Sequence, residues 1–100
     1  PNQLPMAIPL RKFAKRCEEV AIANDKITAL SSSTVSLYEI SRQWRKLADA
    51  TSFISNEPWS EKEEGAAEVI IAALTYLQRI GCKDIEKCLK DTLERQSRKL

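Results

Sequence analysis

The sequence contains no histidine, only two glycines and only three cysteines among its 100 residues. Without histidine, Ser-His and Cys-His mechanisms are excluded, so any catalysis would need carboxylates, lysines or a metal held by carboxylates. The cysteines are Cys17, Cys82 and Cys88, an odd number without CxxC spacing. We therefore expect reduced thiols, and neither a disulfide framework nor a conventional zinc site.

Long apolar runs and a strong net charge are also missing. The longest apolar stretch is shorter than the roughly 20 residues that a membrane-spanning helix needs, and the N-terminus lacks a basic region followed by an apolar one. The net charge of +2 is too small to indicate nucleic acid or an anionic membrane as a partner. We expect a cytoplasmic protein without membrane association. DNA is the least supported partner, because no helix combines a glycine-containing turn with a basic face.

The residues that are present, 43% hydrophobic and 30% charged, suit one domain with a single core. Residues 1–8 are expected to form a flexible segment, in which Met6 is a candidate initiator and the origin of residues 1–5 stays open. Residues 9–100 are expected to form a single helical domain, with helices at about 9–23, 35–53, 61–80 and 85–99. Short connections between them predict an all-α, antiparallel arrangement like a four-helix bundle.

Several residues mark the ends of these helices. Pro9 suits a first helical position. Ser60 followed by Glu63 is a capping box, which predicts the start of the third helix. Gly81 is the expected C-terminal stop of that helix, and Asp84 can cap the fourth.

The second and third helices differ in how their apolar residues are distributed. The second is predicted to turn an apolar face to the core, formed by Leu37, Ile40, Trp44, Leu47, Ala48 and Thr51. This places Glu39, Arg42, Gln43 and Lys46 on its other side. The third is apolar around about three quarters of its circumference, which one chain of four helices can hardly cover. We therefore expect a homodimer or higher homo-oligomer that completes the bundle.

Glu68 is the only charged residue between Gly65 and Gln78. Burying an ionised carboxylate without a partner costs several kcal/mol, so a cation, a metal or water is expected beside it. Helical geometry places Glu68 in a narrow polar stripe with Glu64 and Thr75. A solvent-exposed sliver of helix is the simpler interpretation of this stripe.

The order of these elements, with Trp-Ser-Glu-Lys-Glu-Glu at 59–64 before an Ala/Val/Ile-rich helix and a basic last helix, resembles a known family. It is similar to the all-α nucleoside triphosphate pyrophosphohydrolases of the MazG type over 9–100, and most similar from Trp59 onward. That family carries ExxE and ExxD motifs on successive helices, whose four carboxylates hold magnesium. Mg²⁺ suits this chemistry because it prefers oxygen ligands and bridges phosphate oxygens to an attacking water.

Carried over by position, the resemblance makes Glu39 and Glu68 metal ligands, with Glu64 as a further candidate. Arg42 stands where the second Glu of ExxE would be, and Gly65 where the Glu of ExxD would be. We expect Arg42 to pair with Glu39, Glu64 or Glu68 and so to replace the metal, because its guanidinium stays charged at any working pH. An ordinary surface ion pair between Glu39 and Arg42 is the alternative.

The resemblance also assigns phosphate binding to Arg95 and Arg98 in the basic last helix. A solvated C-terminal turn, favoured by the helix dipole, explains the same two residues without a ligand.

Three functions therefore stay open. The first is a degenerate MazG-like protein, a non-catalytic or weakly active nucleotide-binding or regulatory oligomer. The second is an active magnesium-dependent nucleoside triphosphate pyrophosphohydrolase. The third is a helical protein-interaction module unrelated to nucleotides. The cofactor is correspondingly either none or Mg²⁺.

Overall fold

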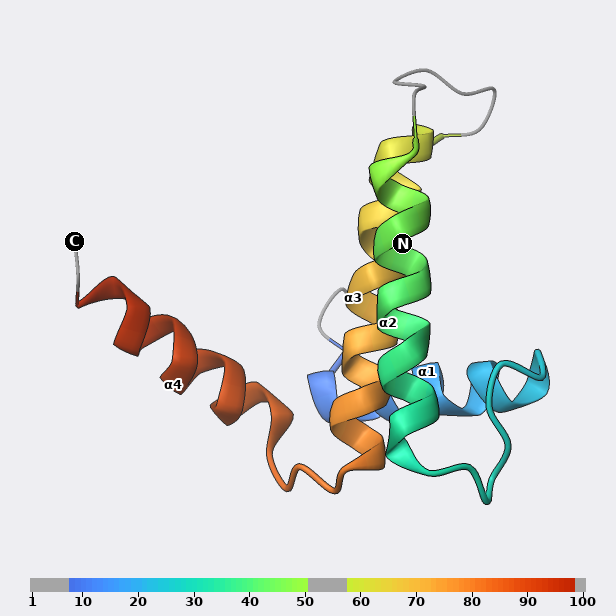
Figure 1. The fold of residues 1–100 in the computed structure, drawn as a ribbon. Helices are drawn as coiled ribbons and strands as arrows, with labels where there is room; N and C mark the ends of the chain where they lie inside the picture. Colours follow the sequence, from blue (N-terminus) through green and yellow to red (C-terminus); the bar gives the residue numbers. More distant parts are fainter. Residues whose placement is uncertain (1–7, 51–57, 99–100) are drawn as a thin grey trace, which may run out of the picture.

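A computed structural model describes residues 8–50 and 58–98, and every regular element in these ranges is an α-helix (Figure 1). The helices are α1 (Leu10–Ala23), α2 (Ser33–Ala48), α3 (Glu61–Arg79) and α4 (Ile85–Ser97). This confirms the all-α class. Predictions for residues 1–7, for the end of the second helix at 51–53 and for residue 99 of the fourth lie outside the described residues.

Helices α2 and α3 lie side by side and antiparallel, and α1 crosses them near the start of α2 (Figure 1). Helix α4 extends away from the other three after its first turn. Helix α2 begins two residues earlier than its pattern predicts and ends at Ala48. Beyond that end, the Lys62 ammonium donates a hydrogen bond of 2.8 Å to the Ala50 carbonyl oxygen, tying the C-terminal end of α2 to the first turn of α3.

The ends of α3 follow the sequence signals closely. The Glu63 N–H donates to Ser60 Oγ at 3.1 Å and the Ser60 N–H donates to Glu63 Oε1 at 2.9 Å, which confirms the capping box. At the other end Gly81 has φ +80°, and the N–H groups of Gly81 and Cys82 donate to carbonyls of the last turn. This is the Schellman arrangement, in which glycine avoids the steric cost of a left-handed backbone. Asp84 caps α4 through the Lys87 N–H at 2.9 Å.

Close packing of α2 on α3 depends on Gly65. The residue is buried, and a Cβ atom built on it would lie 2.9 Å from Leu47 Cδ1 and 3.4 Å from Leu47 Cβ. Glycine costs a helix about 1 kcal/mol relative to alanine. Here the cost is offset because the two helix backbones can approach each other.

The buried hydrophobic core is small. It joins Ala14 and Cys17 of α1 to Leu74 of α3 and Ile85 of α4. Burial raises the pKa of the Cys17 thiol, and the three cysteines are not bonded to one another. Further along α4, Leu89 and Leu93 are 45% and 66% exposed. Helix α4 is therefore anchored at its beginning and leaves the rest of its apolar face uncovered.

Helix α2 is turned differently from the sequence prediction. Its buried residues are the polar Ser36 and Gln43. Leu37 and Trp44, predicted to face the core, are 49% and 60% exposed. The placement of Trp44 in the core was therefore wrong: Ser36 and Gln43 face the pocket between α1 and α3, and Leu37 and Trp44 face outward, while Leu47 of the same apolar stripe packs against Gly65 of α3.

Candidate functional site

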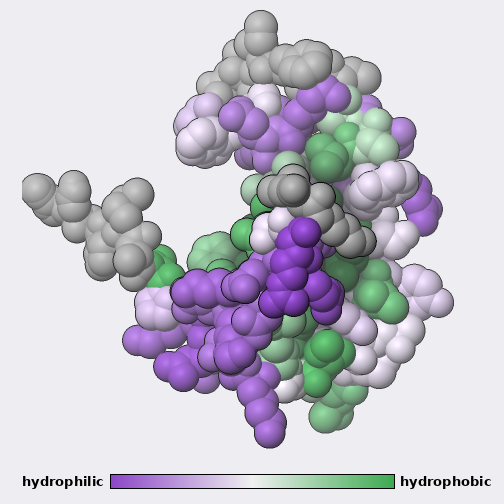
Figure 2. All heavy atoms as spheres, turned by 90° about the vertical axis from the view of Figure 1, so that its left-hand side faces the viewer, coloured by the Kyte–Doolittle hydropathy of each residue, from purple (hydrophilic) through white to green (hydrophobic). Residues whose placement is uncertain are grey.

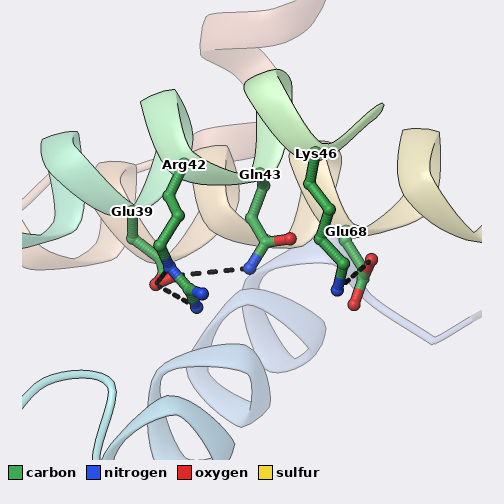
Figure 3. Close-up of polar contacts among 5 residues, drawn as sticks. All are labelled: Glu39, Arg42, Gln43, Lys46 and Glu68. Atoms are coloured by element: carbon green, nitrogen blue, oxygen red, sulfur yellow. Dashed lines mark hydrogen bonds and ion pairs between the residues drawn. The ribbon is translucent and has the colours of Figure 1, made fainter. Parts of the chain in front are cut away.

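Glu39 and Glu68, the two carboxylates singled out by the sequence, line the same pocket. The pocket has a volume of about 160 Å³ and lies where α1, α2 and α3 meet. Figure 3 shows the polar side chains of α2 pointing toward the side on which Glu68 of α3 lies. The lining residues are Cys17, Val20, Ala21, Asn24, Lys26, Ile27, Ser36, Glu39, Gln43, Glu68, Ile71, Ala72 and Thr75.

Glu39 is held by two neighbours on its own helix. The Arg42 guanidinium donates to Glu39 Oε1 from Nε at 2.9 Å and from Nη2 at 2.6 Å, and Gln43 Nε2 donates to the same oxygen at 3.3 Å. The Glu39 side chain is only 13% exposed. Burial by itself would raise the pKa of this carboxyl, but the hydrogen bonds and charge of Arg42, helped by Gln43 and the charge of Lys26, lower it. Glu39 is therefore ionised and already paired.

Glu68 has a different cation beside it. Lys46 Nζ lies 3.6 Å from Glu68 Oε1, and both side chains are more than one third exposed. Such an ion pair contributes little stability, because water screens it. Glu68 also borders a second, wider depression of about 450 Å³, which Glu64 and Trp59 line as well. Glu64 itself does not line the pocket that contains Glu39.

The magnesium site predicted from the resemblance would need several acidic side chains close together. Across residues 8–50 and 58–98, no three acidic, cysteine or histidine side chains come close enough together to hold a metal ion. Arg42 pairs with Glu39, one of the three partners expected for it. Gly65, which the resemblance aligns with the Glu of ExxD, packs so close to Leu47 that a longer side chain there would have to displace it. These side chains do not fit a magnesium site built from four carboxylates.

The predicted phosphate ligands lie elsewhere. Arg95 is exposed on the last turn of α4 and Arg98 is exposed at its C-cap, and this helix extends away from the pocket (Figure 1). Arg98 Nη2 lies 3.7 Å from Glu94 Oε1 of α4. Neither arginine lines either of the two pockets.

Sequence reasoning missed two buried residues that line the pocket, Ser36 and Gln43. Ser36 is 1% exposed and Gln43 is 3% exposed. Within the described part of the chain, Ser36 Oγ and Gln43 Oε1 have no hydrogen-bond partner. The spacing of 36, 39, 43 and 46 is the signal that could have found them, because it places four polar residues in one stripe at helical period.

Comparison of the chain with protein-family models, with curated proteins and with solved structures gives no match. The MazG-type resemblance therefore stays a prediction. None of the helices within the described ranges has both the length and the apolar character needed to cross a membrane.

Proposed function

We propose that this chain is a degenerate MazG-like homo-oligomer that binds a nucleotide or regulatory ligand without hydrolysing it at an appreciable rate. The observation that carries the proposal is the pairing of both family carboxylates with cations of the same chain: Glu39 with Arg42 and Glu68 with Lys46. A guanidinium on Glu39 supplies the positive charge that a divalent ion would otherwise supply. The protein thereby keeps a polar pocket without needing a cofactor.

The metal part of the proposal is tested by calorimetric titration with Mg²⁺ and Mn²⁺ and by assaying pyrophosphate release from a panel of nucleoside triphosphates. The wild type is expected to show neither metal binding nor turnover. Replacing both cations, Arg42→Glu with Lys46→Gln, frees the two carboxylates and adds a third acidic group, so this variant is expected to gain Mn²⁺ binding. Rapid turnover by the wild type, abolished in Glu68→Gln, would instead establish the alternative of an active magnesium-dependent pyrophosphohydrolase.

Binding of a nucleotide is tested separately, by titrating nucleoside triphosphates without metal and following backbone amide resonances by NMR. We expect shifts at pocket-lining residues such as Lys26 and Ala72. Shifts absent from the pocket across the whole panel would remove the nucleotide from the proposal.

Exposed apolar side chains support the oligomeric part. Leu37 and Trp44 are two helical turns apart on the outer face of α2, and Leu89 and Leu93 are exposed on α4. The view from the α4 side shows hydrophobic side chains at the surface beside strongly hydrophilic ones (Figure 2). Apolar surface of this kind marks association sites in proteins. A second copy of the chain would cover it.

Sedimentation tests the oligomer. Trp44→Glu is expected to shift the protein toward monomer while its helical circular dichroism is retained, because the side chain is exposed in the single chain. Leu30→Glu is the matched control, since Leu30 is 97% exposed on the connection between α1 and α2. A well-folded wild-type monomer at micromolar concentration would refute the oligomer.

A further inference from the structure

The pocket between α1, α2 and α3 has the size of a small-molecule site. Its volume of about 160 Å³ is close to that of engineered cavities that hold one benzene ring. Ile27 and Ala72, both buried, form part of its apolar wall, together with the half-buried Ala21. A pocket with these walls suits a planar, mostly apolar molecule of about one ring.

Two unpartnered polar atoms distinguish this pocket from an ordinary packing gap. Ser36 Oγ and Gln43 Oε1 are buried in its lining without a hydrogen-bond partner among the described residues. They lie on one face of α2, seven residues and therefore about 10 Å apart along the helix. A buried polar group left unpaired is costly, so each of these atoms favours a ligand that can complete its hydrogen bonding.

The hydrogen bonds already present determine what kind of ligand group fits. Gln43 uses its Nε2 to donate to Glu39, so the atom that remains open is its carbonyl oxygen, an acceptor. Ser36 Oγ can also accept. Both open acceptors, an amide carbonyl and a hydroxyl, are uncharged. An N–H donor satisfies them, whereas an ammonium ion would have to compete with Arg42 for Glu39 and with Lys46 for Glu68, the two carboxylates that line the pocket.

We propose that this pocket binds a neutral aromatic amine of about one ring, whose N–H group donates to Gln43 Oε1 or Ser36 Oγ while the ring packs on the apolar wall. A ring with two amino groups can satisfy both atoms. This inference deepens the binding role proposed above and rests on it. An aromatic amine needs neither phosphate nor metal. The test with aniline can therefore fail while the nucleotide and metal tests succeed, and it can succeed while they fail.

The test compares aniline with toluene, which has a similar shape and no donor. Each is titrated into the isotopically labelled full chain, and amide shifts of Ala21 and Ala72 report binding. The wild type is expected to bind aniline about tenfold more tightly than toluene, the effect of one buried hydrogen bond. Benzylamine, a cation at neutral pH, is expected to bind more weakly than aniline. Equal affinity for aniline and toluene, tighter binding of benzylamine, or no aniline shifts at these residues would overturn the proposal.

Variants locate the donor contact. Ser36→Ala combined with Gln43→Met removes both open acceptors at nearly constant shape, and is expected to abolish the preference for aniline over toluene. Ser41→Ala on the exposed side of α2 is the matched control and is expected to keep that preference. A preference that survives in the double variant would overturn the assignment of these two atoms.

Thermal unfolding of the single variant Ser36→Ala, without any ligand, tests whether the Ser36 hydroxyl is open. Removing an unsatisfied buried atom is expected to raise the midpoint in Ser36→Ala. A lower midpoint would mean that water already satisfies the hydroxyl, and would overturn the proposal. The comparison of aniline with toluene in the wild type does not depend on any variant folding.

Discussion

Arg79 is expected to be the most important polar side chain for stability. Its guanidinium donates from Nη1 to Glu18 Oε2 of α1 at 3.1 Å, and from Nη2 to the Thr28 carbonyl at 3.2 Å and to the Ser31 carbonyl. The Arg79 and Glu18 side chains are only 10% and 21% exposed. One side chain at the end of α3 therefore holds both α1 and the connection that leads into α2.

The size of the effect follows from these contacts. Breaking a buried ion pair by removing one partner costs about 3–5 kcal/mol, since the other charge stays buried. Because Glu18 keeps some access to water, we expect Arg79→Ala to lower the free energy of unfolding by about 3 kcal/mol. Small domains have total stabilities of about 5–15 kcal/mol, so this is a large share. Arg79→Lys is expected to lose about 2 kcal/mol, since a lysine ammonium lacks the planar fork that reaches three acceptors.

Urea denaturation followed by circular dichroism measures the difference. Arg16→Ala is the control: its pair with Glu19 has an N–O distance of 3.5 Å and is more than half exposed, so it should change stability by less than about 0.5 kcal/mol. Because Arg79 also holds the connection that supplies Lys26 and Ile27 to the pocket, Arg79→Ala should weaken ligand binding as well. A stability loss below about 1 kcal/mol in Arg79→Ala would refute the reasoning.

Three further predictions concern single positions. Gly65→Ala is expected to lower the free energy of unfolding of the wild type by about 1 kcal/mol, because overpacking against Leu47 outweighs the gain in helix propensity. In a Leu47→Ala background the same substitution is expected to raise that free energy by about the same amount. Urea titrations in which both changes have the same sign would contradict this. The interactions that lower the pKa of Glu39 stabilise the fold at pH values above the ordinary carboxyl pKa of about 4.3, and this contribution is lost as the pH falls through the lowered pKa. In Glu39→Gln, the free energy of unfolding should therefore depend less steeply on pH below about 4.5 than in the wild type. The same steepness in both proteins would argue against this. Asp25 has φ 60°, so Asp25→Gly should raise the thermal midpoint by relieving the strain of a left-handed backbone. Gly81 has φ +80°, so Gly81→Ala should lower the midpoint for the same reason.

The sequence was a good guide to the four helices and to the ends of α3, whereas the second helix was predicted to extend past Ala48, where α2 ends. Local hydrogen bonding between residues a few positions apart decides where a helix can start or stop, so Ser60, Glu63, Gly81 and Asp84 were readable in advance. The pairing of Arg42 with Glu39 was also within reach, because residues three apart on a helix are neighbours.

The rotation of α2 could not be predicted from the sequence. This helix carries one polar and one apolar stripe, and the usual expectation buries the apolar one. A small core leaves the choice to packing against other helices: Leu47 packs on Gly65 of α3, and Ser36 and Gln43 are buried. Lys46 was likewise assigned to the outer side and instead reaches Glu68 on α3.

The amino-acid sequence alone therefore determined four helices and the caps of α3 and α4, since each depends on neighbours along the chain. The tertiary structure alone decided which residues of α2 are buried, which cation meets Glu68 and that a pocket with two open acceptors exists. Such features depend on contacts between distant segments, whose geometry is set by the packing of side chains from several helices at once.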